Sequence, residues 1–241
     1  MMHYKIHYFK SLTSTQDKAK EFSKQGLSNI VIISDSQTKS RGRFKRKWHS
    51  SKGGLWMSIL LKPKNIKYLQ HLTFAAAISV VESVKKITGI NANIKWPNDV
   101  HYKNRKLCGI LTEGIFGKEN YVVVGIGLNV NQNLFPYDIQ DIATSLKLIK
   151  NKKIDIGKLT KLILTSFFKL YNDYYNKNKS GDIIQMWKKY SDTISQNLTV
   201  ITKTKKICGK AVGVDENCNL LLKLENNKII KIVEGDVKVR Y

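Results

Sequence analysis

Residues 37–61 read QTKSRGRFKRKWHSSKGGLWMSILL, a strongly basic segment followed by an apolar run. Between Lys39 and Lys52 there are seven Lys or Arg residues and no acid. Because these charges repel one another and little apolar surface is available, residues 39–52 are predicted to form a loop that is mobile on its own. The run from Leu55 to Leu61 follows a Gly-Gly turn and is typical of a buried strand. The stretch therefore predicts a basic loop hinged on a core strand.

The basic loop has the composition of a phosphate clamp. Arginine offers forked donors to an anion, and Gly42 lets backbone N–H groups approach it closely. Trp48 adds an aromatic face that would suit a nucleotide. A solvated surface loop or a nucleic-acid patch fits the loop composition equally well, and both alternatives stay open at this point.

Length and composition bound the class of protein. A chain of 241 residues with 42% hydrophobic content can form one sizeable domain with a small second one. The net charge of +24 favours anionic partners, although much of it fits solvated faces. The sequence has no apolar run of about 18 residues and no signal-peptide pattern, so we expect a cytoplasmic protein without a membrane partner. Three widely spaced cysteines, Cys108, Cys208 and Cys218, indicate reduced thiols and no zinc site.

Apolar patterning predicts two folding units. Strands are predicted at residues 3–9, 29–34, 55–61, 94–100, 106–113 and 121–131, and helices at about 15–26, 68–88, 156–176 and 181–190. After residue 197 the pattern changes to short strands at 197–203, 206–214, 219–224 and 228–233, which is typical of a small all-β domain of SH3-like size. We therefore expect domains at residues 1–195 and 196–241.

Several positions in this pattern are candidates for a ligand site. Ser14 and Thr15 stand at a helix N-terminus, where helix capping is the commoner role of a hydroxyl. Gly125 and Gly127 lie inside a predicted buried strand, which indicates that another group comes close to the backbone there. Gly-x-Gly in this context is weak evidence for a dinucleotide site.

The hairpin-like pair at 94–113 supplies polar candidates. Pro97 interrupts the first strand, so Asn98 and Asp99 are free to face a cleft. Lys106 opens an otherwise apolar strand, either as a snorkelling edge residue or as a charge presented to a ligand.

Taken together, these motifs resemble the biotin-protein ligases. The resemblance is carried by Ser-Thr-Gln at 14–16, Gln37, Arg-Gly-Arg at 41–43, Arg-Lys-Trp at 46–48, Lys-Trp-Pro-Asn-Asp at 95–99, Lys-Leu-x-Gly-Ile-Leu at 106–111 and Gly-Ile-Gly-Leu-Asn at 125–129. Each motif alone is weak, but their order and spacing match over nearly the whole chain.

The resemblance implies a fold and a reaction. The fold is α+β, a mixed β-sheet with helices packed on one side, as in class II synthetases, followed by an SH3-like β-barrel. The implied ligase first joins biotin to ATP, releasing pyrophosphate and forming biotinyl-5'-AMP. It then transfers the biotinyl group to a lysine of a biotin carboxyl carrier protein. ATP, biotin and Mg²⁺ are the implied cofactors, and because family members dimerise variably, a homodimer stays open.

Site residues carry over position by position. The resemblance implies biotin binding by Ser14, Thr15, Gln16, Gln37, Arg41, Gly42, Arg43, Lys106 and Gly109, and nucleotide binding by Trp48, Asn98, Lys106, Asn129 and Arg240. Lys106, Arg41 and Arg43 are the implied catalytic cations. Asp99 is a candidate base for the acceptor lysine, with an orienting role, Mg²⁺ binding and a structural role as alternatives. The metal ligands stay unknown.

The sequence also departs from the family pattern. Ser40 and Lys45 stand where the family's Gly-Arg-Gly-Arg-x-Gly loop commonly has glycine, so a positive φ at either position would be strained. Some family members carry a DNA-binding helix-turn-helix domain, but 13 residues precede Ser14, so no sequence-specific DNA binding is expected. A lipoate-protein ligase and a basic nucleic-acid-binding protein are the alternative functions.

Overall fold

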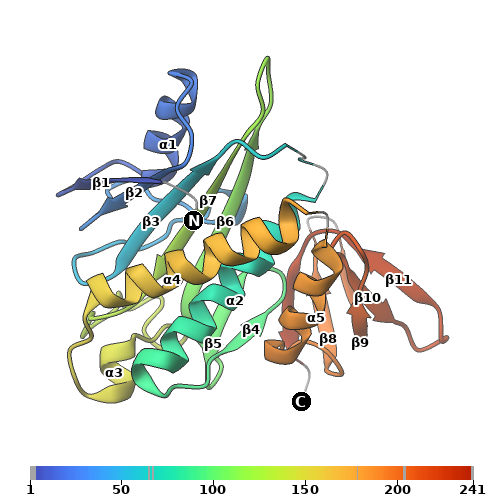
Figure 1. Ribbon diagram of the computed structural model, residues 1–241. Helices are drawn as coiled ribbons and strands as arrows, with labels where there is room; N and C mark the ends of the chain where they lie inside the picture. Colours follow the sequence, from blue (N-terminus) through green and yellow to red (C-terminus); the bar gives the residue numbers. More distant parts are fainter. Residues whose placement is uncertain (1–3, 65, 67, 178, 203–204, 240–241) are drawn as a thin grey trace.

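The computed structural model describes residues 4–64, 66, 68–177, 179–202 and 205–239 (Figure 1). A seven-stranded sheet has the order β1-β2-β3-β7-β6-β5-β4. Its strands are β1 (Lys5–Phe9), β2 (Ile30–Ser34), β3 (Leu55–Leu61), β4 (Asn93–Lys95), β5 (Asp99–Tyr102), β6 (Arg105–Ile115) and β7 (Tyr121–Leu128). β1 runs parallel to β2 and the other neighbours are antiparallel, so the sheet is mixed, as expected.

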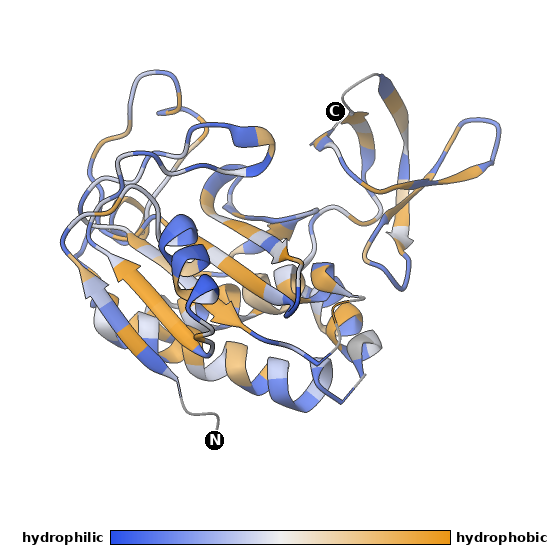
Figure 2. Cartoon of the chain, turned by 90° about the horizontal axis from the view of Figure 1, so that it is seen from above, coloured by the Kyte–Doolittle hydropathy of each residue, from blue (hydrophilic) through white to orange (hydrophobic). Residues whose placement is uncertain are grey.

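Helices cover both faces of this sheet. They are α1 (Thr15–Lys24), α2 (Leu69–Thr88), α3 (Leu146–Lys150), α4 (Ile156–Leu170) and α5 (Ser180–Tyr190), with short 3₁₀ and π segments at Arg43–Lys45 and Tyr171–Tyr175. α2, α4 and α5 lie together on one face (Figure 1), where Phe74 of α2 stacks on Trp187 of α5 with ring centroids 4.3 Å apart. Hydrophobic residues concentrate in the strands, while the connecting loops are largely hydrophilic (Figure 2).

The large helices α2, α4 and α5 pack on one side of the sheet, as expected, whereas the shorter α1 lies on the opposite side. Every residue of β2 is buried. Val31 and Ile33 belong to the main core under α2, whereas Ile30 and Ile32 pack with Ala19 of α1 in a second cluster. Because successive strand residues point to opposite faces, a strand that is apolar throughout needs cover on both. α1 supplies that cover for the second face.

Sequence periodicity located most elements and missed the shortest ones. β3 has the predicted bounds, and the strand predicted at 94–100 is divided at Pro97 into β4 and β5. The helix predicted at 156–176 is α4 followed by the π segment. α3 and the last strand, β12 (Asp236–Val239), were not predicted, because five and four residues are too few to display a period.

The C-terminal residues form a five-stranded antiparallel sheet of the expected SH3-like size. Its order is β11-β10-β9-β8-β12, with β8 at Asn197–Ile201, β9 at Lys206–Val214, β10 at Leu220–Lys223 and β11 at Ile229–Ile232. Trp96 Nε1 donates a hydrogen bond to Cys218 O at 2.9 Å, and buried residues of both sheets form one continuous apolar cluster. The domain boundary at 195/196 stays a prediction, since the two sheets share their core.

Two sequence expectations concern chemistry outside the cavity. All three cysteines are free thiols, as expected, and burial raises the pKa of Cys108 and Cys218. Within the part of the chain that the structure describes, no helix is long and apolar enough to cross a membrane.

The contact between the two sheets gives a stability prediction. Trp96→Phe removes the donor to Cys218 O and leaves that buried carbonyl without it, so the free energy of unfolding should fall. Trp187→Phe is the matched control, because Trp187 is equally buried and its Nε1 has no hydrogen-bond partner among the described residues. We expect Trp96→Phe to cost about 1 to 3 kcal/mol more than the control in urea unfolding. Equal losses would show that the hydrogen bond contributes nothing to stability.

Candidate functional site

A cavity of about 310 Å³ lies between the sheet, the N-terminus of α1 and the basic loop. The predicted site residues that line it are Ser14, Thr15, Gln16, Gln37, Arg41, Gly42, Arg43, Trp48, Asn98, Asp99, Lys106, Gly109 and Asn129. Arg240 lies outside the described residues. The structure thus brings together residues from five separate stretches of sequence, and their binding roles stay predictions.

One end of the cavity is a hydrogen-bonded polar wall. The Thr15 backbone N–H donates to Gln37 Oε1 at 2.7 Å, and the Thr15 hydroxyl donates to the same oxygen at 3.1 Å. Ser58 Oγ lies 2.8 Å from Thr15 Oγ1 and 2.9 Å from Gln16 Oε1. A Cβ at position 125 would lie 2.9 Å from Gln16 Oε1, so a side chain there would displace Gln16. These contacts fix each donor and acceptor at this end.

Ser14 has the capping role that its position suggested. It is the N-cap of α1, and its Oγ accepts a hydrogen bond from the Asp17 N–H at 3.4 Å. The cap places the first turn of α1, and with it Thr15 and Gln16, against the sheet. Ser14 is itself 2% exposed. It supports the wall both by capping α1 and with its own hydroxyl.

Trp48 lies flat against the sheet where two strands lack side chains. A Cβ at Gly127 would be 2.7 Å from Trp48 Nε1, and one at Gly109 would be 3.2 Å from Trp48 Cζ3. The close approach expected at Gly127 is therefore confirmed. Lys106 Nζ lies 5.2 Å from the centroid of the same ring, within cation–π range. The indole N–H is buried and has no hydrogen-bond partner among the described residues.

Lys106 is paired with Asp99. Its Nζ lies 2.7 Å from Asp99 Oδ1, a close ion pair without the alignment of a hydrogen bond. Burial would raise the pKa of Asp99, but the charge of Lys106 and contacts from His101 and Lys106 outweigh it and lower the pKa to about 2. A carboxylate with such a pKa accepts a proton poorly at neutral pH. Among the alternatives for Asp99, the structure favours orienting Lys106 over general-base catalysis.

Arg43 joins the basic loop to both sheets. Its Nη1 donates to Asn98 Oδ1 at 3.2 Å and to Gly235 O at 3.3 Å. Asn98 in turn donates to Ile110 O at 2.7 Å, and this bond fixes the orientation of its amide. Burial lowers the pKa of Arg43, although its guanidinium stays charged because the ordinary value is so high. Arg46 pairs with Asp236 at 2.5 Å, so Gly235 and Asp236, at the start of β12, each contact the loop.

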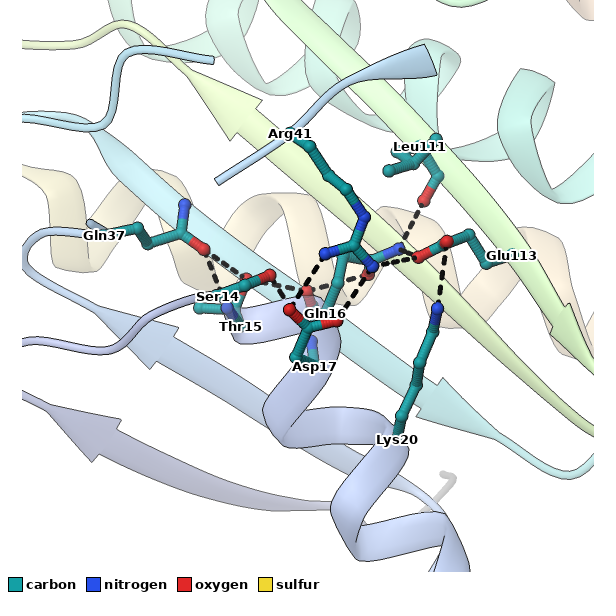
Figure 3. A network of polar contacts seen from close by, with 10 residues as sticks. Ser14, Thr15, Gln16, Asp17, Lys20, Gln37, Arg41, Leu111 and Glu113 are labelled. Atoms are coloured by element: carbon teal, nitrogen blue, oxygen red, sulfur yellow. Dashed lines mark hydrogen bonds and ion pairs between the residues drawn. The ribbon is translucent and has the colours of Figure 1, made fainter. Parts of the chain in front are cut away.

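Arg41 is held by carboxylates. Its two terminal nitrogens donate to Asp17 at 2.9 and 2.8 Å, and Nη2 lies 3.5 Å from Glu113 (Figure 3). The sequence-based interpretation gave Arg41 a phosphate or biotin partner and did not identify these acids. They lie on α1 and β6, far from the loop in the sequence, and nothing in a single sequence links them to it.

Of the two positions where the family commonly has glycine, Lys45 has a positive φ and Ser40 does not. Phe44 and Lys45 have φ values of 55° and 58°, in the left-handed region that glycine favours. Such a conformation costs of order 1 kcal/mol for a residue with a side chain. Ser40 offsets part of this cost, because its Oγ donates to Trp48 O at 2.7 Å and the Trp48 N–H donates to Ser40 O at 3.1 Å.

A further wall of the cavity was not predicted from the sequence. Phe135, Ile139 and Ile142, from the segment between β7 and α3, line the cavity near Lys106, whose N–H donates to Ile142 O at 2.7 Å. The segment has no periodic pattern and was therefore not assigned a role. Its density of large apolar residues, in a stretch with a proline, was the available signal.

The described residues contain no group of three or more His, Cys, Asp or Glu side chains that could hold a metal ion. The carboxylates nearest the cavity, Asp99 and Asp236, each already have a cationic partner. The chain therefore offers no preformed metal cage within this part of the structure.

Comparisons with known proteins cover almost the whole chain. The Biotin/lipoate A/B protein ligase family matches residues 7–131, and the Biotin protein ligase C terminal domain matches residues 193–240. The Bifunctional ligase/repressor BirA of Bacillus subtilis is 38% identical over 239 residues, covering 96% of this chain and 73% of that protein. The Biotin--[acetyl-CoA-carboxylase] ligase of Mycobacterium tuberculosis is 26% identical, covering 88% and 79%. The solved biotin protein ligase from Aquifex aeolicus in complex with biotin and ATP has a TM-score of 0.82 at 32% identity, covering 98% of both chains.

The position of Trp48 gives a prediction about the cavity floor. Gly127→Ala places a methyl group 2.7 Å from the indole, so the ring or the strand must move. We expect the free energy of unfolding to fall by about 1 to 3 kcal/mol. Gly117→Ala is the control, because its added Cβ meets nothing closer than 3.9 Å. If both variants unfold at the same urea concentration, Trp48 does not rest on Gly127.

Proposed function

The chain belongs to the biotin/lipoate A/B protein ligase family, and from that premise we propose that it activates biotin with ATP and biotinylates a carrier protein. The sequence resemblance to biotin-protein ligases is confirmed by these comparisons. The biotin branch is supported by relatives named as biotin ligases and by the solved relative with bound biotin and ATP, and lipoate is not favoured. One observation carries the proposal: a single cavity joins a fixed polar wall to a cluster of cations.

In the first step, a carboxylate oxygen of biotin attacks the α-phosphorus of ATP and pyrophosphate leaves. Both reactants are anions, so neutralising cations at their junction are the main requirement. We assign this role to Lys106 and Arg43. The pairing of Lys106 with Asp99 supports the assignment, because the carboxylate holds Lys106 Nζ at 2.7 Å in the lining of the cavity.

In the second step, the amine of an acceptor lysine attacks the acyl carbon of biotinyl-5'-AMP and AMP leaves. The amine must lose a proton, and the low pKa of Asp99 argues against that residue as the acceptor of it. The acceptor lysine belongs, by family membership, to a biotin carboxyl carrier protein. Because the acyl-adenylate hydrolyses in water, a loop that covers it also protects it.

We assign the two ends of the cavity to the two substrates. The wall of Thr15, Gln16 and Gln37 offers donors and acceptors that suit the urea group of biotin. At the other end, Trp48, Phe135 and Ile139 offer apolar surface that suits a nucleobase, with Asn129 as a polar neighbour. Arg46 and Lys47 face the same space and can pair with phosphates.

Mg²⁺ fits this site as an ion that binds together with the nucleotide phosphates. The ion commonly binds through one or two carboxylates together with substrate phosphates and water, and needs no protein cage. Asp99 and Asp236 are the carboxylates that line the cavity, so they are the candidate partners. When bound, Mg²⁺ would neutralise the phosphate charge that the cations leave uncompensated.

Two further expectations from the sequence remain proposals. We propose a cytoplasmic location, and a homodimer stays open. Repressor activity belongs to relatives such as BirA of Bacillus subtilis by name, and we do not propose it for this chain.

Choice of acid can be measured directly. Thermal unfolding should shift upward with biotin and ATP together, because a ligand that binds the folded state alone stabilises it. Lipoate with ATP should give a much smaller shift. A larger shift with lipoate would move the chain to the lipoate branch. Incubation with ATP, Mg²⁺, labelled biotin and a carrier domain should then add one biotinyl group to the carrier by mass.

Lys106 gives the sharpest test of the mechanism. Lys106→Ala removes the cation at the junction of the two anions, so biotin-dependent exchange of pyrophosphate into ATP should fall by about 100-fold or more. Lys86→Ala, on the exposed end of α2, is the control with the same change of charge. Near-normal exchange in Lys106→Ala would remove this residue from the mechanism.

A further inference from the structure

Arg41 and Arg46 both pair with carboxylates among the described residues, and the pair made by Arg41 is bidentate. Its guanidinium is bound bidentately by Asp17, and Glu113 lies beside it (Figure 3). By contrast, Lys47 lines the cavity and makes no ion pair with a described residue. A fork-to-fork arginine–carboxylate pair fixes orientation as well as distance. Arg41 therefore has the geometry of an attachment point.

Asp17 stands where a helix favours an acid. It lies in the first turn of α1, directly after the capped N-terminus, where the helix dipole stabilises negative charge. The hydrogen bonds to Arg41 lower the pKa of Asp17, and the same bonds raise the pKa of Arg41. The pair is therefore fully charged at neutral pH, and its attraction is available throughout that range.

Glu113 connects the loop to the polar wall of the cavity. Its Oε2 accepts a hydrogen bond from Gln16 Nε2 at 2.8 Å, and its Oε1 pairs with Lys20 at 3.0 Å (Figure 3). Gln16 Nε2 also lies 3.2 Å from Leu111 O, so its amide has a fixed orientation with the oxygen toward Ser58. One carboxylate thus holds both a wall residue and the loop arginine.

We propose that Asp17 and Glu113 are positioning residues that fasten the basic loop over the cavity through Arg41, and that Arg41 serves this fastening rather than phosphate binding. The contacts use the chain's own carboxylates, so they can order the loop before any anion enters. The fastening depends only on contacts within the protein. The identity of the covered molecule, biotinyl-5'-AMP, rests on the proposed function.

Hydrogen exchange of the protein alone tests the fastening. The loop has amides whose exchange reports on its order, since Gly42 N–H donates to Arg46 O and Trp48 N–H donates to Ser40 O. In Asp17→Asn and in Glu113→Gln, exchange over residues 41–48 should accelerate by about five-fold. Glu21→Gln is the matched control, because the ion pair of Glu21 among the described residues is with Lys18 on the same helix, so the change should leave loop exchange unchanged.

A double-mutant cycle separates positioning from a general loss of stability. Arg41→Gln removes the contacts to both Asp17 and Glu113, so it should accelerate loop exchange at least as much as Asp17→Asn. The double variant should be no faster than Arg41→Gln, because the contact to Asp17 is already lost in Arg41→Gln. Asp17→Glu keeps the charge and should restore part of the protection. Additive effects, or wild-type exchange in Asp17→Asn with the urea midpoint unchanged, would overturn the proposal.

Release of biotinyl-5'-AMP then measures the functional consequence. If the fastening retains the intermediate, Asp17→Asn should release it about five-fold faster than the Glu21→Gln control. Faster loop exchange with unchanged release would overturn the role of the loop in retention. Failure of the wild-type protein to form the intermediate would count against the proposed function and leave the exchange result on the fastening intact.

Discussion

The accumulation of positive charge on one loop is the constraint around which the rest of the structure is arranged. Seven cationic side chains without a neighbouring acid repel one another, and the loop gains little from burial. The fold supplies counter-charges from elements that are remote in the sequence: Asp17 from α1, Glu113 from β6 and Asp236 from β12. Asp17 and Glu113 hold Arg41, and Asp236 holds Arg46, so the loop is attached at two of its side chains. The loop is thereby spread over the cavity while Lys47 stays directed at its interior.

The floor beneath the loop follows from the absence of side chains. Gly125 admits Gln16, whereas Gly127 and Gly109 admit the ring of Trp48. These three strand positions have no side chain, so Gln16 and Trp48 can lie directly on the sheet. A sheet normally loses stability through such glycines, which indicates that close approach is the reason for their presence.

Much of this arrangement could be predicted from one sequence, and the part that could not has a common cause. Apolar periodicity predicts β3 and α2, and the order of short motifs places Lys106 and Trp48 in one family pattern. The same periodicity cannot reveal α1 on the second face, because a strand apolar at every position is compatible with either arrangement of cover. Nor could it link Arg41 to Asp17 and Glu113, since single-sequence reasoning contains no information on which distant charges meet. The strain at Lys45 was anticipated because it depends on one residue's own backbone.

The ion pair between Lys106 and Asp99 has a consequence for how acidity governs the reaction. With a pKa of about 2, Asp99 stays ionised throughout the neutral range, so Lys106 faces a negative charge there. The carboxylate charge beside Lys106 is consequently the same from mildly acidic to mildly alkaline solution. A dependence of turnover on hydrogen-ion concentration in that range must then originate outside the Asp99 carboxylate, either in other side chains of the cavity or in the acceptor amine that enters it.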